Sequence, residues 1–164
     1  MRGLRSGLLV AAVVLVLDQA TKALALSVLS GRPPVEVTGF FNLVLVWNRG
    51  VSFGMLQGLG EAGPWLLAAF GLAVCIVLLV WLGREGRSVT RIALGLVLGG
   101  AIGNIVDRAR FGAVVDFLDF HALGYHWPAF NISDSAIVVG AVLLLLDGLR
   151  SDRTAAGEAR GQVR

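Results

Sequence analysis

Long hydrophobic runs separated by short polar segments dominate the chain and predict membrane-spanning helices. The clearest run extends from Pro64 to Leu82 without a charged residue, and as a helix it would measure about 28 Å, close to the thickness of a bilayer core. Three further runs are interrupted by polar residues and cover about 8–29, 89–106 and 133–149. We therefore predict four spans, the second being the most apolar.

The first run follows Arg2 and Arg5 and so has the start of a secretory signal peptide. Its apolar character does not end at Leu17, however, because it resumes beyond DQATK in the segment ALALSVL. No small-residue cleavage site follows a short apolar core. We therefore interpret residues 8–29 as a retained first span.

Two segments depart from this helical pattern. Residues 35–48, VEVTGFFNLVLVWN, alternate in places and are rich in β-branched and aromatic residues, which favours two short strands with a turn at Gly39. Residues 151–164 are small and polar, and we expect a disordered tail after a membrane domain of residues 1–150. The predicted fold class is an all-α membrane protein of four transmembrane helices, with strands in an outer link.

Composition supports a membrane protein and argues against several other classes. Hydrophobic residues make up 56% of the chain and charged residues 15%, whereas soluble domains contain about 25% charged residues. The one cysteine, Cys75, excludes a disulfide within the chain. The net charge of +3 does not indicate nucleic acid binding, because the basic residues lie between the apolar runs and form no stripe.

The loop charges predict an orientation, since cytoplasmic loops are rich in lysine and arginine. Basic residues gather in three segments that four spans would place on one side. They are Arg2, Arg5, Arg84, Arg87, Arg91, Arg150 and Arg153. The arginines of the other two links are offset by acidic residues. We therefore expect both termini in the cytoplasm and the other links on the extracytoplasmic face.

Polar residues within or beside the spans are candidates for function, because ionisable groups in a membrane tend to face the protein interior. In DQATK, Asp18 and Lys22 share one helical face, which fits either a structural ion pair or a direct active-site role. In NRGVSFG, residues 48–54, Asn48 and Arg49 stand among glycines and a serine that predict a tight loop. An ordinary turn would also explain that second pattern.

The segment GGAIGNIVDR, residues 99–108, joins a packing signal to polar residues. Gly99 and Gly103 form a small-xxx-small pair that lets helices approach closely. Asn104 and Arg108 are four residues apart, so they share a helical face on which they could fix neighbouring carboxylates. Alternatively, Asp107 and Arg108 are an anchor pair at the membrane surface.

Two aspartates occupy apolar surroundings in VVDF and FNISDSAI. Asp134 falls in the first turn of the fourth span, with Asn131 as its N-cap, where the helix dipole favours a negative charge. Asp116 has apolar neighbours that favour the neutral acid. If the two met, they would share one proton and could act as acid and base on a water molecule. Capping by Asp134 and a surface position for Asp116 would explain the same residues without catalysis.

Other catalytic patterns compete poorly with this pair. The sequence has no HExxH or SxxK motif. His121 and His126, in HALGYH, fit interfacial residues beside Tyr125 and Trp127 better than metal ligands.

Five short motifs follow one another along nearly the whole chain: DQATK, NRGVSFG, GNIVDR, VVDF and FNISD. In this order they resemble the motifs of bacterial lipoprotein signal peptidases, which form the signal peptidase II or peptidase A8 family. The resemblance implies an aspartyl endopeptidase whose catalytic pair is Asp116 and Asp134. It also implies a fold of four helices with a small extracytoplasmic β-cradle. The residues expected to bind substrate or support the pair are Asp18, Asn48, Asn104, Arg108 and Asn131. Ser133 departs from the family, which usually has alanine there.

The same resemblance implies removal of signal peptides from prolipoproteins in the bacterial inner membrane, by cleavage before a cysteine that carries diacylglycerol. No metal or organic cofactor is implied, and a monomer would suffice. Two other classes remain open from the residues alone. A proton-coupled transporter would place its acids near the membrane midplane, and a scaffold would use its polar residues only to hold helices together.

Overall fold

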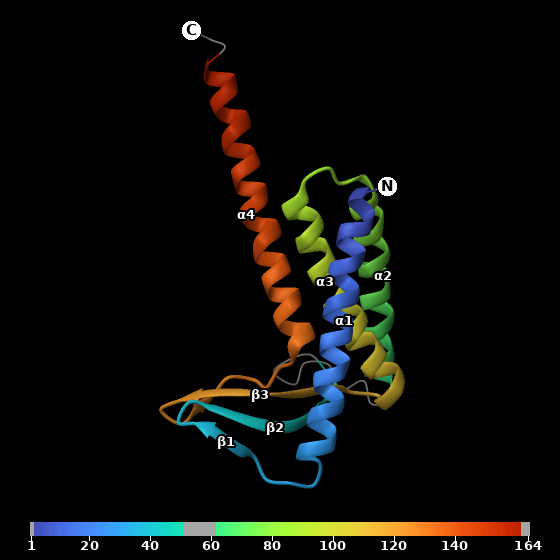
Figure 1. Cartoon of the computed structure of the whole chain (residues 1–164), viewed down its shortest axis with the longest axis vertical. Helices are drawn as coiled ribbons and strands as arrows, with labels where there is room; N and C mark the ends of the chain where they lie inside the picture. Colours follow the sequence, from blue (N-terminus) through green and yellow to red (C-terminus); the bar gives the residue numbers. More distant parts are fainter. Residues whose placement is uncertain (1, 51–61, 162–164) are drawn as a thin grey trace.

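The computed structural model describes residues 2–50 and 62–161, which form a bundle of long helices with a β-sheet at one end (Figure 1). The helices described are α1 (Arg2–Leu29), α2 (Ala62–Arg84), α3 (Ser88–Phe111) and α4 (Ile132–Gly161). In this part of the chain, all four are long and apolar enough to cross a membrane. The prediction of four spans is therefore confirmed, and both ends of the chain lie on the side away from the sheet.

The helices are longer than the apolar runs that predicted them. α3 continues through GNIVDR to Phe111, and α1 already begins at Arg2. α4 continues to Gly161, beyond the predicted end of the fourth span at about residue 149. No proline interrupts residues 150–161, and alanine, arginine and glutamate there favour a helix even without an apolar face.

α3 is the central helix and contacts each of the other three. Its glycines make this possible, because a Cβ on Gly95 would lie 2.5 Å from the carbonyl oxygen of Gly7, and one on Gly99 would lie 2.6 Å from that of Ala11. The small-xxx-small signal therefore marks a real contact with α1. On another side of α3, a Cβ on Gly100 would collide with the backbone of α4.

The sheet is antiparallel, with strands in the order β1 (Val35–Thr38), β2 (Phe41–Asn48), β3 (Val114–Ala122) and β4 (Tyr125–His126). The two strands predicted over 35–48, with a turn at Gly39, are confirmed. β3 was not predicted, because its first four residues are buried on both faces and its sequence does not alternate. Gly112, with a φ of 66°, ends α3 and lets the chain turn directly into β3.

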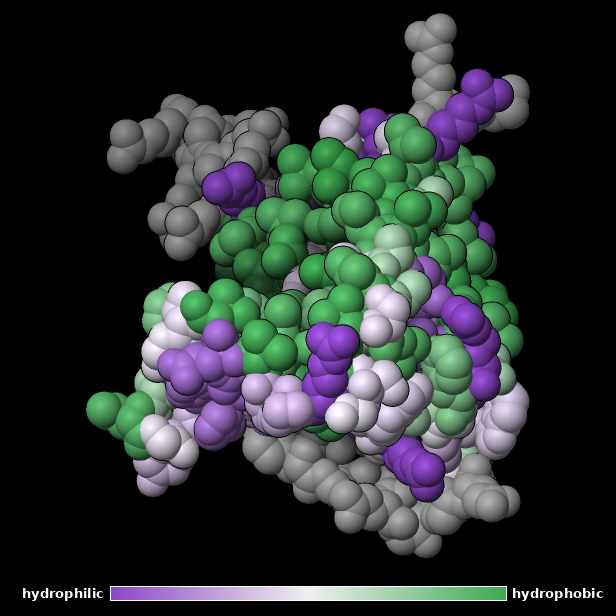
Figure 2. Space-filling view, turned by 60° about the horizontal axis from the view of Figure 1, so that its bottom comes forward, coloured by the Kyte–Doolittle hydropathy of each residue, from purple (hydrophilic) through white to green (hydrophobic). Residues whose placement is uncertain are grey.

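The sheet lies across the ends of the helices, where β2 and β3 run sideways from the bundle (Figure 1). Phe117 of β3 packs against Ala25 and Leu29 in the last turns of α1 and joins the two layers. Figure 2, which brings the sheet end forward, shows polar residues gathered there and hydrophobic residues covering the helices. A bridge between Leu118 and Phe130 holds the segment that precedes α4 beside β3.

Candidate active site

Asp116 lies near the start of β3 and is only 2% exposed. Two asparagine amides donate to its carboxyl oxygens. Asn48 Nδ2, at the end of β2, lies 3.0 Å from Oδ2, and Asn131 Nδ2, just before α4, lies 2.7 Å from Oδ1. The alternative of a surface position for this aspartate is therefore wrong.

Asp134 lies in the first turn of α4, and Asn131 is its N-cap, as predicted. The side chain of Asn131 accepts a hydrogen bond of 3.0 Å from the Asp134 backbone N–H, and Asp134 Oδ2 accepts one of 3.2 Å from the Asn131 backbone N–H. This reciprocal pair has the geometry of a capping box. The other carboxyl oxygen accepts a bond of 2.8 Å from Asn104 Nδ2 of α3.

Asn131 therefore contacts both aspartates, Asp116 through its side-chain amide and Asp134 through its backbone N–H. Burial, followed by the negative charge of Asp134, raises the pKa of Asp116 to about 7, although hydrogen bonds from Asn48 and Asn131 lower it. The two carboxyl groups are thus electrostatically coupled. Such a pair holds a proton at neutral pH, which is what acid–base chemistry requires.

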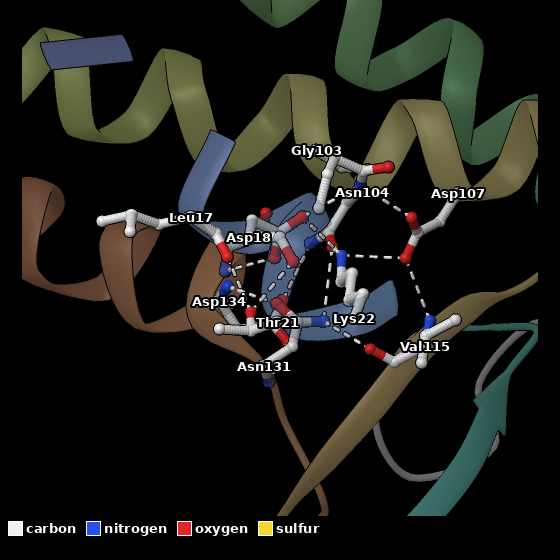
Figure 3. A network of polar contacts seen from close by, with 12 residues as sticks. Leu17, Asp18, Thr21, Lys22, Gly103, Asn104, Asp107, Val115, Asn131 and Asp134 are labelled. Carbon is white, nitrogen blue, oxygen red and sulfur yellow. Dashed lines mark hydrogen bonds and ion pairs between the residues drawn. The ribbon is translucent and has the colours of Figure 1, made fainter. Parts of the chain in front are cut away.

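A buried ion cluster supports this pair from α1 and α3 (Figure 3). Lys22 Nζ lies 2.9 Å from Asp18 and 2.8 Å from Asp107, and its side chain is 3% exposed. The same ammonium donates to Asn104 Oδ1 at 3.2 Å. Asp18 in turn accepts the backbone N–H of Ser133 at 2.9 Å, in the first turn of α4. DQATK therefore forms the expected ion pair, and that ion pair contacts the residues around Asp134.

Lys22 also determines which way the Asn104 amide faces. An ammonium group only donates hydrogen bonds, so the amide oxygen must point toward Lys22. The amide nitrogen is then left to donate to Asp134. One buried cation thereby orients a donor onto the second carboxylate.

Asp107 and Arg108 do not form an anchor pair at the membrane surface, because Asp107 is 1% exposed and belongs to the ion cluster. Asp107 also accepts the backbone N–H of Val115 at 3.1 Å, which fixes the start of β3 beside Asp116. Arg108 Nη1 donates to the carbonyl oxygen of Asn104 at 3.3 Å. Its guanidinium interacts electrostatically with both aspartates of the pair.

The remaining predicted motif is only partly described. In NRGVSFG, Asn48 reaches Asp116 and Arg49 is exposed, whereas residues 51–54 lie outside the described part of the chain. Ser133, the departure from the family pattern, is fully buried, and its hydroxyl has no hydrogen-bond partner among the described residues. The structure therefore gives this hydroxyl no role in holding Asp134.

Sequence reasoning assigned no site role to Gln19 or Asp107, and for Lys22 it left open a structural ion pair or an active-site role. Gln19 Nε2 donates to Asp107 at 2.9 Å and to Asp18 at 3.1 Å, which completes the cluster. Spacing within DQATK revealed the pairing of Asp18 with Lys22. The contact of Lys22 with Asp107 joins two helices, and local spacing carries no signal for such a contact.

Comparisons with known proteins show the family of the chain. Residues 10–150 match the family described as signal peptidase (SPase) II. The lipoprotein signal peptidase of Paraburkholderia phytofirmans is 48% identical over 145 residues, which cover 88% of this chain and 84% of that protein. The lipoprotein signal peptidase of Methylobacterium sp. (strain 4-46) is 46% identical over 165 residues, covering 99% and 96%.

Solved structures show the same fold. One bacterial membrane enzyme, solved by the in meso method at 2.3 Å resolution, superposes with a TM-score of 0.77 at 28% identity and covers 90% of this chain and 89% of its own. A second, at 1.9 Å resolution, gives a TM-score of 0.76 at 29% identity, covering 88% and 92%. Since the family match and these relatives extend over most of its length, the chain belongs to the signal peptidase II family.

Proposed function

We propose that this signal peptidase cleaves prolipoproteins before their diacylglyceryl-modified cysteine and that Asp116 and Asp134 are its catalytic pair. The observation that carries the proposal is the meeting of a buried carboxyl group from β3 and a half-buried one from α4 at one asparagine. Burial, followed by the negative charge of Asp134, raises the pKa of Asp116 to about 7. No packing requirement explains such a costly arrangement.

The two aspartates would have different roles. Asp116, buried in the sheet, holds the shared proton near neutral pH. Asp134 holds the negative charge, since its carboxylate accepts hydrogen bonds from Asn104 and from a backbone N–H at the start of α4. Arg108 and Lys22 supply positive charge beside the pair.

In the first step, a water oxygen attacks the peptide carbonyl carbon while Asp134 takes a proton from that water. Asp116 gives its proton to the carbonyl oxygen, so that a neutral tetrahedral diol forms. In the second step, the C–N bond breaks. Asp134 returns its proton to the leaving nitrogen, and Asp116 takes one back from the diol. Both aspartates then regain their starting states, with no metal in the scheme.

The membrane would present the substrate to this pair. Four spanning helices put the end of the bundle that carries the pair at the membrane surface. The acyl chains of the modified cysteine would lie against apolar helix faces, with the scissile bond at the level of the pair. We place this site on the extracytoplasmic face of the bacterial inner membrane and both termini in the cytoplasm. A monomer would be sufficient.

The two other classes considered from the sequence, a proton-coupled transporter and a scaffold, fit the structure less well. The comparisons give a proton-coupled transporter no support, because the matched family and the relatives named above are peptidases. Asp116 lies in β3 and Asp134 in the first turn of α4, and these elements meet at the sheet end of the bundle and not near its middle, where a transporter would bind its proton (Figure 1). A scaffold would not need a carboxyl group that holds a proton at neutral pH.

Cleavage of a defined precursor tests the proposed substrate. The purified full chain would be incubated with a prolipoprotein that carries diacylglycerol on its cysteine and, separately, with the unmodified precursor. We expect only the lipidated precursor to be shortened, with the lipidated cysteine as the new N-terminus. Equal cleavage of both precursors, or a cut at another bond, would contradict the substrate assignment.

A further inference from the structure

The outer half of the sheet has two unlike faces. Cross-strand partners lie on the same face, so the pairing of Phe41 with Phe120, and of Ala122 with Tyr125, collects aromatic residues on one of them. The rings of Phe41 and Phe120 are 4.8 Å apart. The backbone N–H of Trp127 donates to the carbonyl oxygen of Phe120, which continues the ladder beyond β4. We call this side, comprising Phe41, Phe120, Tyr125 and Trp127, the aromatic face.

The opposite face of the same strands is polar. Asn42 pairs with Asp119 across β2 and β3, and the Asn42 amide donates to the Asp119 carboxylate at 3.0 Å. The ring of His126 lies 2.9 Å from that carboxylate and stacks on His121. Glu36, paired with Asn42, is exposed on this side too. The outer sheet is therefore amphipathic.

Asp116 shows which face is turned toward the membrane. Residues two apart in a strand point the same way, so Asp116, Leu118 and Phe120 share the aromatic face. Asp116 bonds Asn131, and the ring of Phe120 stacks on that of Phe130 at a centroid distance of 5.9 Å; both partners lie in the segment that leads into the membrane span of α4. The aromatic face thus points toward the bilayer, and the polar face points away from it.

The turn of the hairpin between β3 and β4 contains an unusual residue for its backbone conformation. Its two turn residues, Leu123 and Gly124, have φ angles of 52° and 81°. Such turns favour asparagine or glycine at both positions, because a side chain is strained where φ is positive. Leu123 is nevertheless a leucine, and it is 100% exposed. Tyr125 and Trp127 beside it are 85% and 68% exposed.

We propose that this hairpin docks on the lipid leaflet on the sheet's side of the membrane, with Leu123 entering the acyl region and Tyr125 and Trp127 lying at the headgroups. Aromatic residues with a polar tip favour that interface, and an apolar turn residue gains free energy by leaving water. The helices already place a bilayer on the side that the aromatic face points to. The proposal therefore extends the membrane contact from the helices to the sheet and does not depend on the catalytic assignment.

Spin labels on single cysteines test this docking. In a Cys75→Ala background, the full chain would carry Leu123→Cys, Trp127→Cys or Glu36→Cys, and would be reconstituted in vesicles of phosphatidylethanolamine and phosphatidylglycerol. Collision rates would be measured with oxygen, which concentrates in lipid, and with a nickel chelate, which stays in water. We expect labels at 123 and 127 to favour oxygen and the label at 36 to favour nickel. Equal nickel accessibility at all three positions would overturn the proposal.

A variant that preserves the β3–β4 turn separates an effect on lipid docking from an effect on folding. Leu123→Asn creates the Asn-Gly pair that this turn prefers, so the melting temperature should stay the same or rise. The label at Trp127→Cys should then shift toward nickel accessibility, because the inserted leucine is gone. If shielding of the labels depended instead on the ratio of protein to lipid, a second copy of the chain would cover the hairpin, and lipid docking would be wrong. Peptidase activity in detergent should be unaffected, which keeps this test independent of the proposed function.

Discussion

At the scale of single residues, Asp116 is costly to the fold. Its carboxyl group is buried in β3, and its pKa is raised to about 7 by burial and by Asp134. A carboxyl group with a raised pKa in the folded state favours folding at low pH, and this contribution is lost as the pH rises through about 7. This cost to stability at neutral pH is consistent with the proposed catalytic role of Asp116.

The pH dependence of cleavage follows from the same group. Because Asp116 donates a proton to the carbonyl oxygen in the proposed mechanism, kcat/KM should fall above pH 7, about tenfold for each further pH unit. The midpoint should lie near the raised pKa of Asp116, about 7. Initial rates on a lipidated precursor between pH 5 and 9 provide the measurement. A rate that stays constant up to pH 9 would show that no such proton is needed.

Lys22 should affect both stability and rate. Lys22→Met leaves Asp18 and Asp107 buried without their cation, which costs about 3–5 kcal/mol. It also frees the Asn104 amide to rotate away from Asp134, and misplacement of this kind lowers kcat on the order of a hundredfold. Thermal melting and kcat would be measured on the same preparations.

A double variant separates the two effects of Lys22. Adding Asp107→Asn to Lys22→Met removes one unpaired buried charge and should restore part of the stability. Lys22, the charged donor to Asn104, is still missing and only the longer bond of 3.4 Å from Asn131 Nδ2 remains, so kcat should stay low. Recovery of kcat together with stability would mean that Lys22 only holds the helices together.

At the scale of elements, the sequence predicted what depends on local pattern. Apolar runs predicted four spans, the alternation over residues 35–48 predicted β1 and β2, and an Asn-x-x-Asp pattern predicted the cap of α4. β3 escaped notice, because a strand buried on both faces resembles any short apolar run. The pairing of β2 with β3, which brings Asn48 to Asp116, depends on the position of the whole sheet and has no local signal.

The packing of α3 gives a prediction at this scale. Gly99→Ala would place its Cβ 2.6 Å from the backbone oxygen of Ala11 on α1, and overpacking of this kind costs about 1–3 kcal/mol. Gly148→Ala on α4 is the matched control, because its Cβ would meet nothing within 4 Å. The control should leave stability unchanged or raise it by up to about 1 kcal/mol. Equal melting temperatures for the two variants would contradict the close contact between α1 and α3.

At the scale of the whole molecule, the four spans put the α2–α3 link and the sheet on opposite sides of the membrane. In a Cys75→Ala background, Glu36→Cys in β1 should react with a membrane-impermeant maleimide in intact spheroplasts. Gly86→Cys, at an exposed position in the α2–α3 link, should react only after permeabilisation. The reverse pattern would place the catalytic pair in the cytoplasm and would contradict the orientation predicted from the arginines.

The most direct measurement of the central claim compares cleavage of a lipidated precursor by the unaltered chain, Asp116→Asn and Asp134→Asn. Each variant removes one carboxyl group and keeps the size of the side chain, so both should melt as cooperatively as the unaltered chain. We predict that each loses at least about a thousandfold in kcat, because the two groups act as a unit. Cleavage by either variant within a few-fold of the unaltered rate would show that these two aspartates are not the catalytic pair.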